Sequence, residues 1–412
     1  MASSWGDHRL PNPVGAFREI YQGTRPTHLS RAPGRVNLLG DHTDYNGLPV
    51  LPMALRREVR VVFAPREDAT VRAVNRYREY GSREFTVSPD IPMGPPGDWG
   101  NYLRAPAQHL TRRFGALKGL DALVCSSLPV ASGLSSSSAL VIAMARALLA
   151  ANDIELPALE LADEMARAER YTGTQGGAMD QAISVGAREG HAARIEFKPL
   201  QTVHIPVPEG WRFIVAHSLV RAEKSGPAQE AYNLRTRECA QALRALHPHL
   251  GAGIDPEGHT ASYRRLLEGT CLQELVDTAE AHLEGPLLKR FRHVVTEGNR
   301  VYGGEHALRR DDPLTFGLLM NGSHQSLRDD YEVSSPELNR LVELALEAGA
   351  RGARLTGAGF GGCIVALAEG PRTPDVVEAL REGYYRDREL PEPVEDVLFV
   401  AQAAGGASVR AL

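Results

Sequence analysis

Four consecutive serines follow a glycine turn in residues 129–139 (PVASGLSSSSA) and run directly into an apolar segment rich in helix-forming residues. Serine hydroxyls and the unpaired amide groups at the start of a helix make a site for anions, and the helix dipole adds a favourable potential. A helix cap needs only one such side chain. The segment therefore predicts a buried helix that begins with a phosphate-binding loop. A plain serine cap is the alternative.

The sequence excludes the best-known phosphate loops. No GxxxxGK[ST] stretch occurs, and the VAIK, HRD and DFG set of protein kinases is missing. Residues 357–362 (GAGFGG) match the dinucleotide pattern GxGxxG, which must follow a strand and open a helix. Here the next residues, 363–367 (CIVAL), read as another strand. We therefore expect a tight strand–loop–strand turn near the ligand, and a dehydrogenase is disfavoured.

A second polar segment, residues 33–46 (PGRVNLLGDHTDYN), concentrates hydrogen-bonding side chains. They are Arg35, Asp41, His42, Asp44, Tyr45 and Asn46. Carboxylates and an imidazole at close spacing suit the hydroxyls of a polyol, which donate and accept. A polar surface turn is the alternative. A metal site at Asp41, His42 and Asp44 is weaker, because no further ligand cluster such as HExxH accompanies them.

A third segment, residues 173–181 (GTQGGAMDQ), places one carboxylate beside three glycines. Glycine lets the backbone pass close to a ligand. Asp180 is therefore a candidate general base, although an acid after a glycine turn is commonly only a helix cap.

The arrangement of the remaining pattern predicts an α+β protein in two lobes. We expect strands at 58–64, 70–75, 119–126, 191–197, 202–206, 211–217, 353–356 and 363–367, and helices at 139–151, 158–171, 231–246 and 336–348. A proline-containing connection near 198–208 suggests a boundary, giving domains 1–205 and 206–412.

Composition narrows the class of protein. The 412 residues are 43% hydrophobic and 24% charged, which is typical of globular chains. A net charge of −5 gives no electrostatic reason to expect nucleic acid or an anionic membrane as partner. No run of 18 apolar residues or secretory signal occurs, and the four cysteines stand singly. We expect a reduced, cytoplasmic enzyme.

The motifs together resemble those of the GHMP kinases, and specifically the galactokinase family. The family signature runs Gly-Arg-x-Asn-aliphatic-Ile-Gly-Asp/Glu-His-x-Asp-Tyr, and residues 34–45 read GRVNLLGDHTDY, with Leu39 for the isoleucine. The serine segment resembles the family's ATP loop, LTGAGFGGC (355–363) its third motif, and GGAMDQ its CGIMDQ segment. Residues 320–338 (MNGSHQSLRDDYEVSSPEL) are similar too. The resemblance extends from about Ala32 to the C-terminus, in family order.

The resemblance implies an N-terminal α/β lobe of ribosomal-S5-like topology and a ferredoxin-like C-terminal lobe, with the active site in the cleft between them. It implies transfer of a phosphoryl group from ATP, with Mg²⁺, to the anomeric hydroxyl of a sugar. ATP and a small sugar are the expected partners, and a monomer or homodimer the expected state.

The same resemblance assigns site residues. Asp180 takes the position of the catalytic carboxylate and Arg35 that of its paired arginine. The expected sugar-binding residues are Asp41, His42, Asp44, Gly177 and Tyr232. The expected ATP loop is Gly133, Leu134, Ser135, Ser136, Ser137 and Ser138. Ser137 and Glu169 are the expected metal contacts, with Glu169 eleven residues before Asp180, one fewer than the family pattern.

Some departures concern the sugar. Asp41 stands where most galactokinases carry Glu, at the position that reaches the C6 hydroxyl, and Ala178 replaces a larger aliphatic residue. Residues 217–232 also depart from the pattern, and Arg221 or Lys224 could pair with an acidic sugar. D-Galactose is the first choice, with galacturonic acid, glucuronic acid, L-arabinose and N-acetylgalactosamine as alternatives. A non-catalytic galactose and ATP sensor is disfavoured because the serine loop is continuous.

Overall fold

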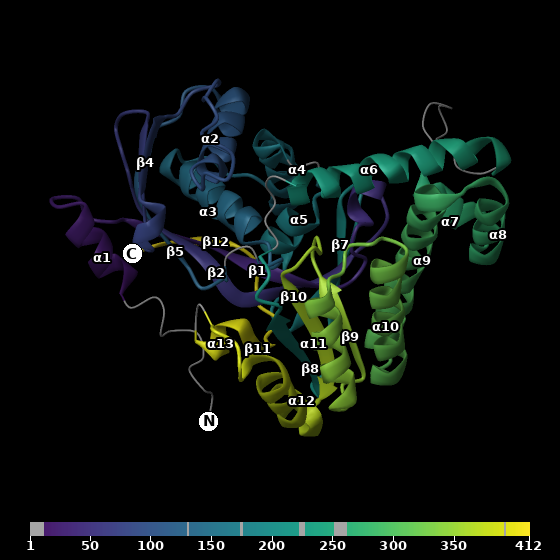
Figure 1. The fold of residues 1–412 in the computed structure, drawn as a ribbon. Coiled ribbons are helices and arrows are strands. Elements are labelled where there is room, and N and C mark those ends of the chain that lie inside the picture. The colour runs from purple at the N-terminus through teal and green to yellow at the C-terminus, as the bar shows by residue number, and fades with distance from the viewer. Residues whose placement is uncertain (1–11, 130–131, 174–175, 222–226, 251–261, 391–392) are drawn as a thin grey trace.

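The computed structural model describes residues 12–129, 132–173, 176–221, 227–250, 262–390 and 393–412 (Figure 1). Its strands form two main sheets and one separate hairpin, and helices lie against both sheets. This combination of sheets and helices confirms the predicted α+β architecture.

The larger sheet has six strands in the order β12-β1-β2-β5-β3-β4. Neighbouring strands are antiparallel, except that β3 and β5 are parallel. The strands are β1 (His28–Leu39), β2 (Leu51–Pro65), β3 (Thr70–Asn75), β4 (Ser82–Thr86), β5 (Leu120–Ser126) and β12 (Ser408–Ala411).

Both faces of this sheet are packed. Successive residues of a strand point to opposite sides, and in β2 the two sets are buried in different clusters. Val61 and Phe63 of β2 belong to the main core, whereas Val62 and Ala64 pack with Phe17 of α1. The helices are α1 (Pro13–Ile20), α2 (Asn101–Phe114), α3 (Ser136–Ala151), α4 (Ala158–Glu169) and α5 (Met179–Gly186). Helix α3 is buried along most of its length, which accounts for its apolar sequence and gives the serine loop a rigid base.

The smaller sheet has four antiparallel strands in the order β11-β8-β10-β9. These strands are β8 (Trp211–His217), β9 (Gly352–Thr356), β10 (Cys363–Glu369) and β11 (Leu398–Ala401). Helices α11 (Pro336–Glu347), α12 (Thr373–Leu380) and α13 (Val394–Val397) lie beside it (Figure 1). A hairpin of β6 (His191–Glu196) and β7 (Gln201–Pro206) joins the larger sheet through a bridge between Val50 and Ile195.

A helical region completes the fold, drawn at the right of Figure 1. It contains α6 (Pro227–Leu246), α7 (Tyr263–Gly269), α8 (Leu272–His282), α9 (Gly285–Arg309) and α10 (Pro313–Asp329). Helix α9 packs against α6, α8 and α10 and also contacts β1 and β2, while α10 packs on β9. Val301 of α9 and Phe316 of α10 enter the core of the larger sheet. Helices α9 and α10, which follow β8 in sequence, therefore pack against β1, the strand that contains Arg35.

Most of the predicted elements are confirmed. The strands at 70–75 and 211–217 agree residue for residue, and the loop at 357–362 lies between β9 and β10 as expected. The helix expected at 158–171 ends earlier, at Glu169, because a 3-10 turn (Arg170–Thr172) leads into Gly173, which has φ 89°.

Strand β12 was not predicted, and it belongs to the larger sheet although it follows the smaller one in sequence. It pairs with β1, placing Ala411 opposite His28. Its four residues are exposed or half-buried, so its sequence carries no apolar alternation. The proposed division at 205/206 separates the strands of the two main sheets except for β12.

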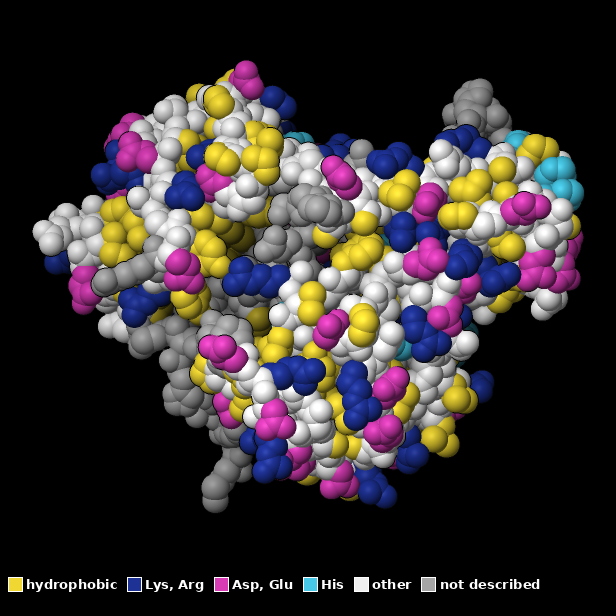
Figure 2. Space-filling view, viewed as in Figure 1, with side chains coloured by type: hydrophobic (Ala, Val, Ile, Leu, Met, Phe, Trp, Pro, Cys, Tyr) yellow, Lys and Arg dark blue, Asp and Glu magenta, His cyan; other side chains and the backbone are white. Residues whose placement is uncertain are grey.

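Acidic and basic side chains are interspersed over the face shown in Figure 2, with no large area of one sign. The molecule as a whole carries a net charge of −5. In the part of the chain that the structure describes, no helix is both long and apolar enough to cross a membrane.

Candidate active site

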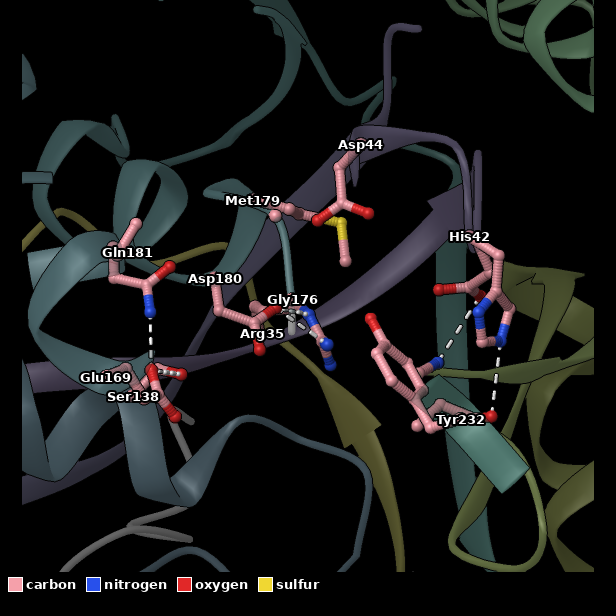
Figure 3. A pocket seen from close by; sticks show the side chains of 15 residues that line it. Arg35, His42, Asp44, Ser138, Glu169, Gly176, Met179, Asp180, Gln181 and Tyr232 are labelled. Carbon is pink, nitrogen blue, oxygen red and sulfur yellow. Dashed lines mark hydrogen bonds and ion pairs between the residues drawn. The ribbon is translucent and has the colours of Figure 1, made fainter. Parts of the chain in front are cut away.

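A pocket lies where the end of β1, the start of α5, helix α6 and the β9–β10 loop meet (Figure 3). The lining residues are Arg35, Asp41, His42, Asp44, Ser138, Ala166, Glu169, Gly176, Gly177, Met179, Asp180, Gln181, Tyr232, Gly357 and Ala358. Every predicted catalytic and sugar-binding residue is in this set. Of the predicted ATP loop, Ser138 alone is in it.

Asp180 and Arg35 form a nearly buried ion pair in this pocket (Figure 3). Arg35 Nε donates to Asp180 Oδ1 at 2.9 Å, and Nη2 lies 2.8 Å from the same oxygen. Asp180 is in the first turn of α5, where the helix dipole also favours a negative charge. Both effects favour an ionised Asp180 carboxylate.

Arg35 also holds the serine loop. Its Nη1 donates to the Gly133 carbonyl at 2.5 Å, and its backbone N–H donates to the Leu134 carbonyl at 3.1 Å. One arginine therefore sets the separation between the predicted phosphate loop and the predicted base.

The serine loop has unused hydrogen-bonding capacity at the start of α3. Ser135 adopts a left-handed conformation with φ 61°, and its side chain does not cap the helix. Its Oγ is buried and has no hydrogen-bond partner among the described residues. A buried hydroxyl without a partner is costly, so this position is suited to an anion's oxygen. Val130 and Ala131 of the same motif lie outside the described residues.

On the other side of the loop, Glu169 accepts hydrogen bonds from Ser138 Oγ at 2.8 Å and from Gln181 Nε2 at 2.5 Å (Figure 3). The structure thus pairs Glu169 with Ser138, whereas the expected metal hydroxyl was Ser137. Gln181 Oε1 is buried without a partner among the described residues. Carboxylate, hydroxyl and amide oxygens form a donor set that Mg²⁺ prefers.

The serine loop and the β9–β10 loop touch through glycines. A Cβ on Gly357, whose φ is 90°, would lie 2.6 Å from the Gly133 carbonyl oxygen. Glycine is required here both for its conformation and for the close approach. Because β10 follows this loop, the dinucleotide interpretation of GAGFGG is excluded.

His42 connects the polar segment at residues 33–46, here called the sugar segment, to the β9–β10 loop. It has a left-handed φ of 66°, and its Nε2 lies 3.2 Å from the Ala358 carbonyl oxygen. A carbonyl only accepts, so Nε2 carries a proton, and Nδ1 accepts from the Tyr45 hydroxyl at 2.8 Å. Burial, followed by the nearby His293, holds the pKa of His42 well below its usual range, so the ring is neutral. Tyr232 lies beside it, with 5.5 Å between ring centroids.

Asp41 is almost fully buried, and its carboxylate has several protein donors. Arg354 Nη2 donates to Oδ2 at 2.5 Å, and Asn37 Nδ2 donates to Oδ1 at 2.9 Å. The Gly357 N–H also approaches Oδ2 at 3.3 Å. No cluster of three or more His, Cys, Asp or Glu side chains suited to a metal ion exists among the described residues, which weighs against the metal interpretation of the Asp41 segment.

Asp44 is a half-buried acid close enough to Asp180 to feel its charge. Burial raises its pKa to about 6, and the negative charge of Asp180 adds to the rise. Gly177 packs directly against it, since a Cβ there would lie 2.2 Å from Asp44 Oδ2. The glycine predicted from the family pattern thus has a steric role next to Asp44.

Sequence reasoning did not single out Arg354, the buried partner of Asp41. A charged residue inside the apolar strand β9 could have identified it, because a fully buried charge needs a partner. Among the proposed cations for an acidic sugar, Arg221 is exposed and does not line the pocket, and Lys224 lies outside the described residues.

Comparisons with known proteins agree with this geometry. Three family profiles match in order: "Galactokinase galactose-binding signature" at residues 15–65, "GHMP kinases N terminal domain" at 101–187 and "GHMP kinases C terminal" at 305–386. A galactokinase of Chloroflexus aggregans is 41% identical over 375 residues, covering 90% of this chain and 91% of that protein. One of Chloroflexus aurantiacus is 39% identical over 387 residues, covering 92% and 93%. This chain belongs to the galactokinase family.

Solved structures agree. The crystal structure of Lactococcus lactis galactokinase complexed with galactose matches this galactokinase-family chain with a TM-score of 0.84 and 29% identity, covering 96% of this chain and 98% of that one. Methanococcus jannaschii mevalonate kinase, at 16% identity and a TM-score of 0.59, shares the fold over 93% of this chain and 100% of that one. The predicted GHMP kinase fold is confirmed, and the chain is a sugar kinase of the phosphotransferase class.

Replacing Gly177 by Ala is expected to weaken sugar binding because the new Cβ would displace the Asp44 carboxylate. A forced shift of this kind costs about 1–3 kcal/mol, so KM for the sugar should rise at least about fivefold. The matched control is Gly176→Ala, whose Cβ would meet its nearest neighbour, Tyr232, at 3.8 Å. Equal sugar KM values for the two variants would contradict this steric role.

The raised pKa of Asp44 also predicts a pH-dependent stability. The folded state binds the Asp44 proton more tightly than the unfolded chain, so this group lowers stability progressively from about pH 4 to pH 6 and fully above pH 6. Asp44→Asn should therefore raise the free energy of unfolding at pH 8 by up to about 3 kcal/mol, with a smaller gain at pH 5.

Urea unfolding at both pH values measures this gain. The exposed Asp90 provides the control variant, Asp90→Asn. A gain for Asp44→Asn that is the same at pH 5 and pH 8 would contradict the raised pKa.

Proposed function

We propose that this protein phosphorylates D-galactose at its anomeric hydroxyl with MgATP, giving galactose 1-phosphate and ADP. The observation that carries the proposal is the position of Arg35, which bonds at once to Asp180 and to the carbonyl of Gly133 in the serine loop. The Arg35 side chain thereby holds both Asp180, the base for the sugar hydroxyl, and the serine loop that would bind the phosphates of ATP. Phosphoryl transfer depends mainly on such positioning and on charge stabilisation.

Asp180 is the proposed base. The anomeric hydroxyl is a weak nucleophile at neutral pH, and a carboxylate within hydrogen-bond distance can accept its proton. Arg35 keeps this carboxylate ionised and offsets negative charge on the transferring phosphoryl group. The amide groups at the start of α3 and the unpartnered Ser135 hydroxyl would bind the phosphates of ATP.

The residues beside the serine loop suit a magnesium ion. Glu169 and Ser137 would hold it. The Ser138 hydroxyl donates a hydrogen bond to Glu169, and the Gln181 amide oxygen beside them has no partner among the described residues. The ion would neutralise charge on the β- and γ-phosphates. We place the reaction in the cytoplasm.

The charges of the pocket favour a neutral sugar. Asp41, Asp44, Glu169 and Asp180 line it, and Arg35 is the cation among the described lining residues. A uronic acid would bring another carboxylate into this surplus of negative charge, so galacturonic and glucuronic acids are poorer candidates. Asp44, Tyr232 and Gly177, which line the pocket, are the residues we assign to the hydroxyls of galactose. L-Arabinose and N-acetylgalactosamine are the neutral alternatives.

An ADP-release assay with MgATP tests the proposal directly. The sugars are galactose, glucose, N-acetylgalactosamine, galacturonic acid, glucuronic acid and L-arabinose, and galactose should give the highest kcat/KM. A different preferred sugar would overturn the substrate assignment. If none of the six sugars is phosphorylated but calorimetry shows ATP binding that depends on the sugar, the protein is a sensor.

Asp180→Asn is expected to lower kcat at least about 100-fold, because the amide cannot accept the proton. The control is Asp163→Asn, which removes a surface carboxylate paired with Arg167 on α4. Wild-type turnover in Asp180→Asn would remove Asp180 from the mechanism.

Asp41→Glu tests the buried ion pair beneath the sugar segment. Asp41 is 1% exposed and its carboxylate already accepts from Arg354 and Asn37, so an extra methylene forces a shift that costs about 1–3 kcal/mol. KM for galactose should therefore rise at least about fivefold, and D-fucose, which lacks the C6 hydroxyl, should show the same rise. An unchanged or lower KM for galactose alone would show that the longer acid is accommodated and reaches C6.

A further inference from the structure

Two buried side chains of α9 bind the backbone of the sugar segment, although neither lines the pocket. Glu297 Oε1 accepts the Gly40 N–H at 2.7 Å, and His293 Nε2 lies 3.1 Å from the Asp41 carbonyl oxygen. Both side chains are completely buried. They lie outside all the motifs that identified the family, and more than 250 residues separate them from the segment they bind.

The two bonds are directional and consecutive. A carbonyl oxygen only accepts, so His293 donates from Nε2, while its Nδ1 faces the Ser326 hydroxyl at 3.0 Å. Burial lowers the pKa of His293 to about 4, so the ring is neutral at working pH. Helix α9 thus accepts a hydrogen bond from the Gly40 N–H through Glu297 and donates one to the Asp41 carbonyl through His293. These bonds fix the orientation of the backbone directly before His42.

Glu297 is held as an anion. Burial alone would raise its pKa, but Arg300 and Arg354 outweigh burial and hold the pKa well below its usual range. Arg300 Nε donates to Oε2 at 2.7 Å and Ser323 Oγ donates to Oε1 at 2.6 Å. Arg354 lies between Glu297, 3.9 Å away, and Asp41, 2.5 Å away. Its position therefore depends on the charges of both acids.

The packing leaves little freedom at this junction. Gly40 has φ 93°, and a Cβ there would lie 2.8 Å from Val301 of α9 and 2.8 Å from the Cα of Val50. The sugar segment therefore rests directly on the helix. A small displacement of α9 or of its polar side chains would move Asp41, His42 and Asp44 together.

We propose that Glu297 and His293 are positioning residues of the sugar site: through the backbone of Gly40 and Asp41 they set the placement of the sugar-binding side chains, and sugar affinity depends on them while ATP affinity does not. The proposal rests on the sugar kinase function proposed above. The ATP side is held by other contacts: Arg35 bonds to Asp180 and to the serine loop, and α3 packs against α2, α4, α5 and the larger sheet.

The first test is Glu297→Gln, which keeps the shape of the side chain and removes its charge. KM for the sugar should rise at least about fivefold, because small misplacements in a site are costly, while KM for ATP stays within about twofold. Glu305→Gln is the matched control on the same helix. It loses ion pairs with Arg194 and Arg309 and has no described contact with the sugar segment. The control should leave both KM values unchanged.

The second test separates positioning from stability. His293→Leu removes the donor to residue 41 and should raise the sugar KM, whereas His293→Gln keeps an N–H donor and should recover most of the affinity. Ser323→Ala is the mild variant: it removes one hydrogen bond to Glu297, and a smaller rise in sugar KM should follow in a protein that remains folded. Thermal unfolding of every variant is recorded beside the kinetics.

The outcomes distinguish this proposal from the proposed function. Wild-type turnover on galactose tests the function, and the variants are then measured with whichever sugar the wild type prefers, or by calorimetry of sugar and ATP binding if turnover is absent. A larger effect on the sugar than on ATP supports the positioning role. Equal effects on sugar and ATP, or lower stability with unchanged sugar affinity, would overturn it.

Discussion

The buried ion pair between Asp41 and Arg354 joins the two sheets. Asp41 follows β1 of the larger sheet, whereas Arg354 belongs to β9 of the smaller one, and both side chains are excluded from solvent. Two buried charges are tolerated only when they are paired and their remaining donors and acceptors are used. Asn37, the Gly357 N–H and the Asn37 carbonyl supply most of those bonds. The position of the sugar segment relative to the β9–β10 loop depends on this pair.

A second, nearly buried ion pair, between Arg35 and Asp180, lines the pocket itself. It connects β1 to the serine loop and to the start of α5. Two arginines that belong to different sheets thus each hold an acid that lines the pocket, and of the two only Arg35 lines the pocket itself. The start of α3, with the unpartnered Ser135 hydroxyl, belongs to the loop that Arg35 holds, so fixed dipoles are available there for phosphate charge.

Local features were predictable from the sequence because their physical cause is local. The serine run, the glycines before Asp180 and the β9–β10 turn each require particular residues at consecutive positions, and the structure places them as expected. Strand β12 was not predictable, because its exposed side chains carry no alternation. Glu297 and His293 were missed because their partners lie far away in sequence. The inward orientation of Asp41 likewise follows from Arg354, which the sugar motif does not contain.

The pairing of β12 with β1 has a consequence for biosynthesis. Until residues 408–411 have left the ribosome, one side of β1 presents unpaired backbone groups, the kind of edge that promotes association with other chains. The larger sheet, although most of its strands are translated first, is completed only after the whole smaller sheet has been made. An N-terminal unit therefore cannot complete its sheet while the chain is still being made, and a nascent polypeptide that lacks residues 408–411 still exposes the edge at His28–Arg31.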